Sequence, residues 1–300
     1  MAGSPDHFHH VRDFPHFELP FGLDPIGLPK ISVPLYGDFQ LTKFMVLQVI
    51  AAVLTLVIFA GLSKRVGSGL PTKGRFWNFW EALALFIRDE VVRPTIGEDH
   101  HAHGHDDHGH GDHAHHHDKK ALSGHHSDKY LPFIWSCFFF VLFCNLLGAI
   151  PLMGSPTASI CVTGVLAVSV FVYNVFNGSK QFGFIGFWKN QLPDLGLKGA
   201  MGIGIGTLMW CIEALGLFIK HGVLAVRLFA NMMGGHTVVG VILGFIAMQE
   251  VSGGMLVAVI PGSILGQVCI GMLELFVAFL QAYVFALLST MFLSASMHSH

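Results

Sequence analysis

Two apolar stretches near the C-terminus carry the residues whose chemistry any function of this chain must use. They run roughly from Gly202 to Met248 and from Met255 to Met297. Their charged or titratable side chains are Glu213, Lys220, His221, Arg227, His236, Glu250 and Glu274. A charge at the centre of a bilayer costs roughly 2.5 to 3.5 kcal/mol, so such residues mark ion and proton pathways by default. The earlier apolar runs carry almost none, which predicts that the function lies in the C-terminal third.

Helical spacing around Arg227 determines which of these residues can meet. On an ideal helix, Glu213, Arg227 and Asn231 fall within about 40° of one face, and His236 projects to nearly the opposite side. Glu213 lies about 21 Å from Arg227 along the axis, which is too far for an ion pair. We therefore expect Arg227 to take its carboxylate partner from elsewhere. The alternative is a structural role for Arg227, such as capping a bend or binding a lipid phosphate.

Glu274 is surrounded mostly by apolar residues and needs a polar partner. Gln281 lies seven residues later, two helical turns away, and therefore shares its face. His236 is the intramembrane histidine that is best placed along the preceding helix. A pair of histidine and glutamate is a natural proton relay, because both side chains can take up and release protons. A purely structural hydrogen bond between them is the alternative.

The remaining ionisable residues of these stretches have simpler interpretations. We favour a snorkelling role for Lys220 and His221, which would extend their polar tips towards a helix end, over a direct role in the function. Glu250 lies beside Gly253 and Gly254 in a predicted loop and is expected to be solvated.

The composition places the chain among membrane proteins. It has 300 residues, of which 52% are apolar and 12% charged, and this charged fraction is about half that of a typical soluble domain. Its basic residues are scattered, which argues against a nucleic-acid partner. We predict an all-α integral membrane protein with about five spanning helices and one interfacial amphipathic helix. The last two helices should be long and strongly tilted, unless bends near Pro261 and the neighbouring glycines break them.

Composition also divides the chain into segments. Apolar residues recur at helical spacing from Phe76 to Val91, which predicts the interfacial helix. The expected order is a proline- and aromatic-rich irregular arm (1–42), a first span (43–63), the interfacial helix (76–93), a histidine-rich disordered loop (98–129), a membrane hairpin (130–177) and a long tilted helical hairpin (200–297). Lysines and arginines gather after the first and third spans, so both connections are expected to face the cytoplasm or the equivalent compartment.

Histidine alternates with Asp, Gly and Ala in the low-complexity run from His100 to His126. Such tracts could gather zinc or nickel weakly, but this one lacks the fixed spacing of a closed metal site. The candidate ligands are His101, His103, His105, His115 and His117. We favour a variable solvated insertion over a metal sensor, and we expect no other cofactor.

Two other classes of function fit the composition less well. A metal-ion transporter could use the histidine tract as a collecting loop, but it would need ligands converging at mid-membrane, and the first three predicted spans offer none. A membrane-bound enzyme would need a nucleophile with its base or a metal-ligand motif, and none is present. The chain is therefore not expected to be catalytic alone.

Two motifs closely resemble those of subunit a of the F-type ATP synthase. They are Leu224-Ala-Val-Arg-Leu-Phe-Ala-Asn-Met-Met-Gly-Gly-His236 and Leu273-Glu-Leu-Phe-Val-Ala-Phe-Leu-Gln-Ala-Tyr-Val-Phe285. The resemblance also covers the order of spans from about Phe44 to the C-terminus, the amphipathic helix and the segment from Asn145 to Pro151. The arm and the histidine tract lie outside it.

This resemblance implies a proton-conducting stator subunit of a rotary ATP synthase. In that family the arginine matching Arg227 faces a rotating ring of c subunits and meets its proton-carrying carboxylate. Two half-channels load and unload that carboxylate on either side of the arginine. Gln281 matches the glutamine beside the arginine, Asn231 the asparagine of the motif, and Glu213 the acidic residue of the inner half-channel. His236 and Glu274 stand exchanged relative to many bacterial members, as in mitochondrial ones.

The resemblance also implies the surroundings of the chain. Its partners would be the c ring, on the helix face that carries Arg227, the b subunits of the peripheral stalk, the lipid bilayer and protons. The expected location is a bacterial inner (plasma) membrane, with the mitochondrial inner membrane as the alternative.

Overall fold

The computed structural model describes residues 16–17, 26–33, 37–66, 74–96, 126–150, 154–190, 200–247 and 253–297. Before the first long helix, short strands pair as two antiparallel ladders: β1 (His16–Phe17) with β2 (Ile26–Gly27), and β3 (Lys30–Val33) with β4 (Gly37–Gln40). The expectation of an arm without regular structure was therefore wrong here. Ile31 stands opposite Phe39 in the second ladder, and β-branched and aromatic residues favour strands.

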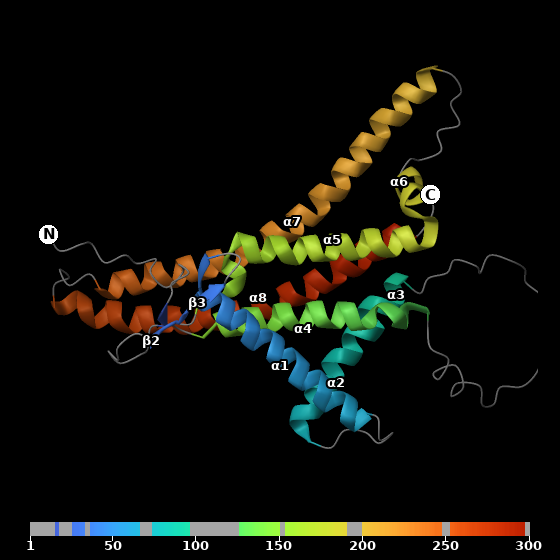
Figure 1. Cartoon of the computed structure of the whole chain (residues 1–300). Coiled ribbons are helices and arrows are strands. Elements are labelled where there is room, and N and C mark those ends of the chain that lie inside the picture. Colours follow the sequence, from blue (N-terminus) through green and yellow to red (C-terminus); the bar gives the residue numbers. More distant parts are fainter. Residues whose placement is uncertain are drawn as a thin grey trace, which may run out of the picture.

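Five helices of the described chain are long and apolar enough to cross a membrane, which confirms the predicted fold class. The first three are α1 (Lys43–Val66), α4 (Leu131–Gly148) and α5 (Ile160–Phe182). Short helices flank them: η4 (His126–Tyr130), η5 (Pro156–Ala158) and α6 (Phe184–Asn190). In Figure 1, α4, α5 and α8 form the middle of the molecule, and α1 and α2 cross below them.

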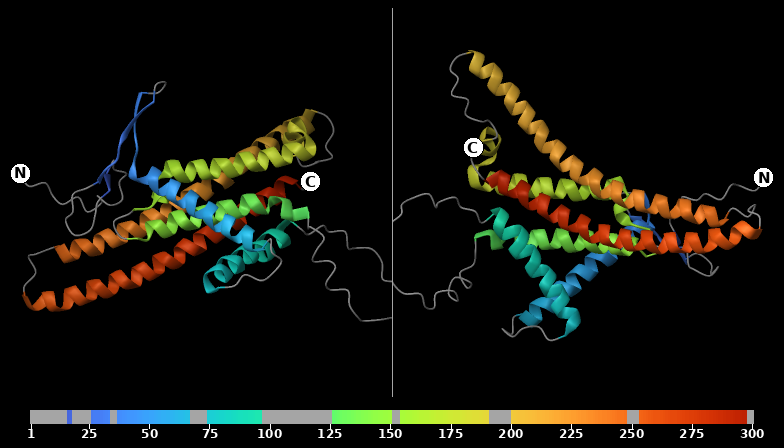
Figure 2. Two further views of the ribbon diagram at one scale, coloured as in Figure 1. Left: turned by 60° about the horizontal axis from the view of Figure 1, so that its bottom comes forward. Right: turned by 180° about the vertical axis from the view of Figure 1, so that it is seen from behind.

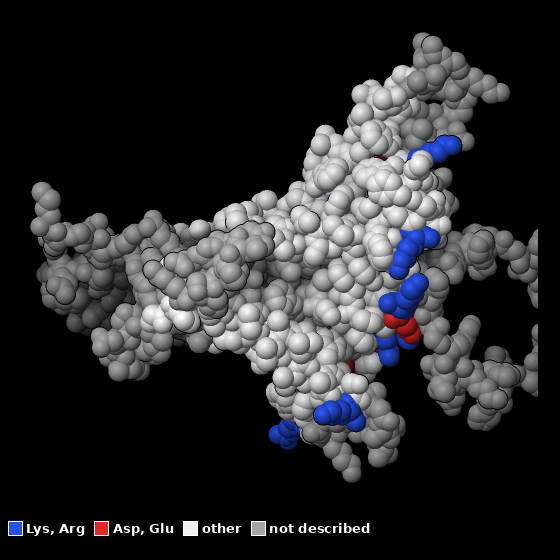
Figure 3. Space-filling view, in the orientation of Figure 1, with Lys and Arg blue, Asp and Glu red and all other residues white. Residues whose placement is uncertain are grey.

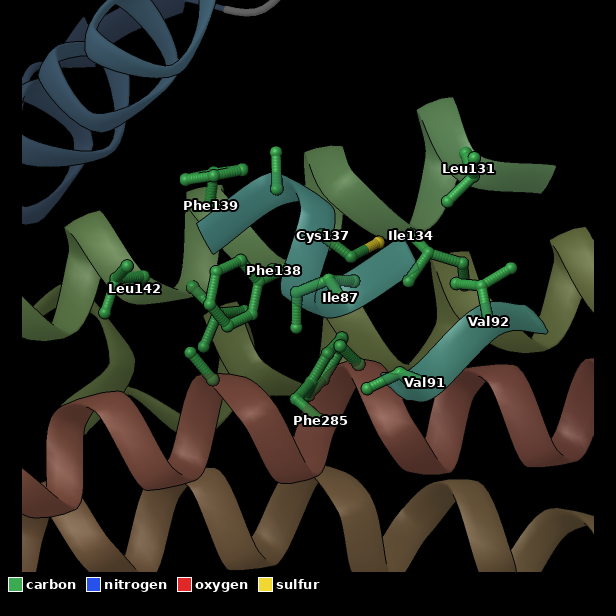
Figure 4. Packing of buried hydrophobic residues seen from close by; sticks show 14 of the residues in the cluster. Ile87, Val91, Val92, Leu131, Ile134, Cys137, Phe138, Phe139, Leu142 and Phe285 are labelled. Carbon is green, nitrogen blue, oxygen red and sulfur yellow. The ribbon is translucent and has the colours of Figure 1, made fainter. Parts of the chain in front are cut away.

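The predicted amphipathic helix forms a continuous rod of three helical segments, α2 (Arg75–Phe86), the π-helical η3 (Ile87–Val92) and α3 (Arg93–Ile96). Its apolar stripe is buried at Trp80, Ala84, Ile87 and Val91. Figure 4 shows Ile87, Val91 and Val92 beside Phe138 of α4 and Phe285 of α8. Burial of this stripe explains why apolar residues recur there at helical spacing.

Ion pairs hold the polar side of this rod. Arg93 lies 3.2 Å from Asp89 and 3.3 Å from Asp128, which precedes α4. Arg88 lies 2.8 Å from Asp89, and its hydrogen bond holds the pKa of Asp89 below the usual range. In the view of Figure 3, Lys and Arg gather over the end of the molecule that carries α3 and α6. The compartment that this end of the molecule faces stays a prediction.

The last two helices are α7 (Ala200–Ala247) and α8 (Gly253–Met297), of 48 and 45 residues. At 1.5 Å per residue α7 is about 72 Å long, more than twice the thickness of a hydrocarbon core of about 30 Å. Neither helix is broken, although Pro261 lies inside α8. The C-terminal half of α7 lies along α8, whereas its N-terminal half diverges from the bundle (Figure 1 and the right-hand view of Figure 2).

Candidate functional site

Arg227 lies on the exposed face of α7. A neighbouring side of α7 packs into the molecule through buried Leu224, Leu228 and Met232, which recur every four residues and therefore lie along one stripe of the helix. Arg227 opens into a shallow apolar groove, and its neighbours there are Ile219, Gly222, Val223, Val226 and Ala230. No carboxylate of the described chain lies within ion-pair distance of it. The structure thus presents a cation on an apolar surface without an internal counter-ion.

One helical turn beyond Arg227, Asn231 joins α7 to α8. Its side-chain amide donates a hydrogen bond of 2.6 Å to Oε1 of Gln281. Gln281 is fully buried, and its Nε2 has no hydrogen-bond partner among the described residues. The described chain therefore leaves the donor nitrogen of this buried amide unsatisfied, which is uncommon in native structures.

Glu274 and His236 face each other across α7 and α8. Nδ1 of His236 lies 3.8 Å from Oε1 of Glu274, and the two side chains are 15% and 10% exposed. This separation is longer than a hydrogen bond, so the two side chains are neighbours that are not hydrogen-bonded through these two atoms. Gly235 allows the approach, because a Cβ there would lie 3.1 Å from Oε1 of Glu274. The structure therefore brings the two residues together, as the sequence predicted. Their role as a proton relay remains a prediction.

Glu213 lies on the diverging half of α7. Its Oε1 is 3.6 Å from Nζ of Lys220, and both side chains are about half exposed. Glu213, Lys220 and Arg227 are spaced by seven residues and therefore share one helix face. The structure brings Glu213 together with Lys220 and leaves it apart from the other predicted site residues.

His221 does not extend towards a helix end, so that interpretation was wrong. It is 5% exposed, and its Nε2 lies 3.1 Å from the side-chain nitrogen of Asn174 on α5. The rings of Phe171 and Phe292 pack around it. Its position on the buried stripe of α7, together with Leu224 and Leu228, places it inside the protein.

The spans before α7 contribute polar residues that the sequence reasoning passed over. Buried Asn145 on α4 donates to the backbone carbonyl of Ala278 on α8, and its own oxygen accepts a 2.8 Å hydrogen bond from Thr157. Thr157 also contacts Ser155 at 2.7 Å. The search for ionisable groups missed these neutral ones, although amides and hydroxyls inside apolar runs signal interhelical contacts.

The histidine tract, including His101, His103, His105, His115 and His117, lies outside the described residues. Within the described part of the chain, no group of three His, Cys, Asp or Glu side chains could hold a metal ion.

The order of these groups along α7 limits what the site can do. Glu213 lies on the N-terminal side of Arg227, and His236 with Glu274 on the C-terminal side. A guanidinium stays charged at any relevant pH and stabilises the ionised form of a carboxylate brought beside it. The arrangement can therefore keep a carboxylate from another chain deprotonated at the groove. Titratable side chains that could exchange protons with it lie on both sides of Arg227 along the helix.

Comparison with known proteins agrees with this geometry. A family model described as ATP synthase A chain matches residues 116–294. The chain is 34% identical to "ATP synthase subunit a" of Chloroherpeton thalassium over 96% of its own length and 75% of the relative's. It is 34% identical to the protein of the same name from Myxococcus xanthus, with 97% and 88% covered. It is 36% identical to "ATP synthase subunit a 2" of Chlorobaculum tepidum, with 97% and 72% covered.

Proposed function

We propose, because this chain belongs to the ATP synthase A chain family, that it conducts protons past Arg227 as the stator subunit of a rotary ATP synthase. The chain is a multi-pass membrane protein and a subunit of a larger complex, so it does not catalyse ATP synthesis alone. The observation that carries the proposal is the position of Arg227: a permanent cation on an exposed apolar face, without a counter-ion in the described chain.

The counter-ion in this proposal is the proton-carrying carboxylate of a ring of c subunits. The groove beside Arg227 is apolar and open, which suits the smooth surface of a rotating partner. A carboxylate that arrives there must release its proton, because the guanidinium favours the ionised form. The same charge repels a proton that would cross directly from one side to the other.

Proton entry and exit then occur on opposite sides of Arg227. His236 and Glu274 serve the half-channel towards the C-terminal end of α7, with Asn231 and Gln281 between them and Arg227. Glu213 serves the half-channel towards the N-terminal end. A membrane potential of 100 mV supplies about 2.3 kcal/mol per charge moved, which becomes torque as successive carboxylates are loaded on one side and unloaded on the other.

The remaining partners and the location follow from the same proposal. The b subunits of the peripheral stalk hold the chain against rotation, and the bilayer surrounds the exposed apolar surfaces of α1 and α5. The membrane is a bacterial plasma membrane, in agreement with the bacterial relatives. The basic end of the molecule faces the cytoplasm.

Disulfide cross-linking tests whether the ring lies on the Arg227 face. Val223 and Ala230 line the groove with Arg227, and each is changed to Cys in a chain whose native cysteines are alanine. The c subunit carries a cysteine next to its carboxylate. Both positions should form disulfides with the ring, whereas Val172→Cys, on the exposed face of α5, should not. Cross-links from position 172 alone would place the ring on another face and contradict the proposal.

A further inference from the structure

The buried pair of His221 and Asn174 lies where α7 leaves the bundle. Every residue of α7 from Thr207 to Lys220 is at least partly exposed, and His221 begins the buried stripe that continues to Met232. Figure 1 and the right-hand view of Figure 2 show the N-terminal half of α7 diverging from α5. The pair is therefore the first buried side-chain link that α7 makes on entering the bundle from its diverging half.

The hydrogen bonds of His221 are those of a neutral ring. Nδ1 lies 2.8 Å from the carbonyl oxygen of Leu217, which can only accept, so Nδ1 carries the proton. Nε2 is then the acceptor for the amide of Asn174, at 3.1 Å. Both nitrogens are occupied, and Asn174 is 3% exposed. A neutral histidine whose two ring nitrogens both take part in hydrogen bonds is poorly suited to carry protons.

The side chains around this hydrogen bond are apolar, so the bond is the contact with a strict geometric requirement. The ring centres of Phe171 and Phe292 lie 5.2 and 4.8 Å from that of His221. Between His221 and Arg227 the other buried residues of α7 are apolar. In a membrane no hydrophobic driving force holds one helix against another, and apolar contacts tolerate small rotations, whereas a hydrogen bond requires a defined distance and angle. On the N-terminal side of Arg227 the pair therefore sets the rotation of α7 about its axis relative to α5.

Arg227 depends on that rotation. It lies six residues beyond His221, which is about 9 Å along the axis and about 120° around it. We infer that the hydrogen bond between Asn174 and His221 is a positioning contact for Arg227, keeping the guanidinium on the exposed face that meets the ring. The inference rests on the proposed function, and it assigns His221 to holding the arginine in place rather than to carrying protons.

Inverted membrane vesicles with the complete complex test this inference through the number of protons pumped per ATP hydrolysed. His221→Leu and Asn174→Leu each remove the bond by replacing one of its two partners with an apolar side chain. The exchange variant, His221→Asn with Asn174→His, can restore it. Asn177→Leu is the matched control, because Asn177 lies on the same helix and donates to the carbonyl of Tyr173 within it. Membrane content of the subunit is measured for every variant.

We expect each leucine variant to lower the coupling ratio by about threefold or more, the factor that corresponds to one average interhelical hydrogen bond in a membrane. The exchange variant should regain most of the loss, and Asn177→Leu should pump as wild type does. His221→Gln, which can still bond but cannot titrate, should keep the wild-type pH profile of pumping. Leucine variants that assemble and pump normally would overturn the inference, as would a pH profile that changes with His221→Gln.

Arg227→Ala is measured in the same vesicles to separate the two claims. If Arg227→Ala abolishes pumping and the leucine variants do not affect it, the positioning inference alone fails. If Arg227→Ala pumps normally, both the proposed function and the positioning inference fail.

Discussion

Asn231 donates a hydrogen bond of 2.6 Å to Oε1 of Gln281, and this bond ties α7 to α8 one turn beyond Arg227. The partner atom is buried, whereas Asn231 lies on the exposed face. The bond therefore connects the face that carries Arg227 with the interior, where Glu274 and His236 lie one to two turns further along. In the proposed mechanism it orients the amide of Asn231 on the face that a carboxylate at the groove would approach.

A double-mutant cycle tests whether these two amides act together. Asn231→Leu and Gln281→Leu should each lower coupled proton pumping several-fold, because each leaves the other buried or bound amide without its partner. The double variant should lose little more than either single one. The coupling free energy expected for such a contact is about 0.5 to 2 kcal/mol, and rates of ATP-driven acidification measure it. Strictly additive losses would mean that the bond is incidental.

Exchanging His236 and Glu274 tests their role as a pair. His236→Ala and Glu274→Ala should each reduce pumping by about a hundredfold or more, because a positioned proton-transfer group typically contributes roughly 10²- to 10⁴-fold. His236→Glu combined with Glu274→His keeps both groups at a separation near the observed 3.8 Å and should recover a large share of the rate. An exchange variant that assembles but is as inactive as the alanine variants would show that each position requires its own residue.

Gly178 is predicted to be intolerant of any side chain. A Cβ there would lie 2.5 Å from Cδ2 of Phe187 and 3.1 Å from the backbone oxygen of Ser296, whereas Gly164 on the same helix has nothing within 4 Å. Gly178→Ala should lower the stability of the subunit by about 1 to 3 kcal/mol through overpacking. Gly164→Ala should be neutral or stabilising, since alanine favours helix. Thermal unfolding in detergent compares them, and equal melting temperatures would contradict the packing described.

The ion pairs of Asp89 should make the stability of the rod formed by α2, η3 and α3 depend on pH. Because the hydrogen bond from Arg88 holds the pKa of Asp89 below its unfolded value, the stabilisation is complete above that value and is lost as the pH falls through the folded pKa. Asp89 is partly exposed, so the effect is small, under about 1 kcal/mol. Asp89→Asn should lower the melting temperature slightly at neutral pH. This difference in melting temperature between the variant and the wild type should vanish in acid. A difference that grows as the pH falls would contradict the prediction.

Length and hydropathy were sufficient to predict the spanning helices, because about twenty apolar residues have few other stable structures in a bilayer. The proximity of His236 and Glu274 also followed from position along adjacent antiparallel helices. The partner of His221 could not be predicted in this way. It depends on how α5 is rotated against α7, and the sequence of α7 alone carries no such information. The strand pairing of Ile31 with Phe39 was missed for a similar reason, since proline-rich composition outweighed a short β-favouring pattern.

Proton pumping by the complete complex tests the central claim most directly. ATP-driven acidification of vesicles is compared for wild type, Arg227→Ala, Lys180→Met and deletion of residues 100–117. Lys180 is the matched cation, because it lies over the ring of Phe176 near the end of α5 and has no part in the proposed path. Arg227→Ala should abolish pumping, and the other two variants should pump as wild type does. Normal pumping by Arg227→Ala would contradict the account, and metal uptake that depends on residues 100–117 would then favour a transporter.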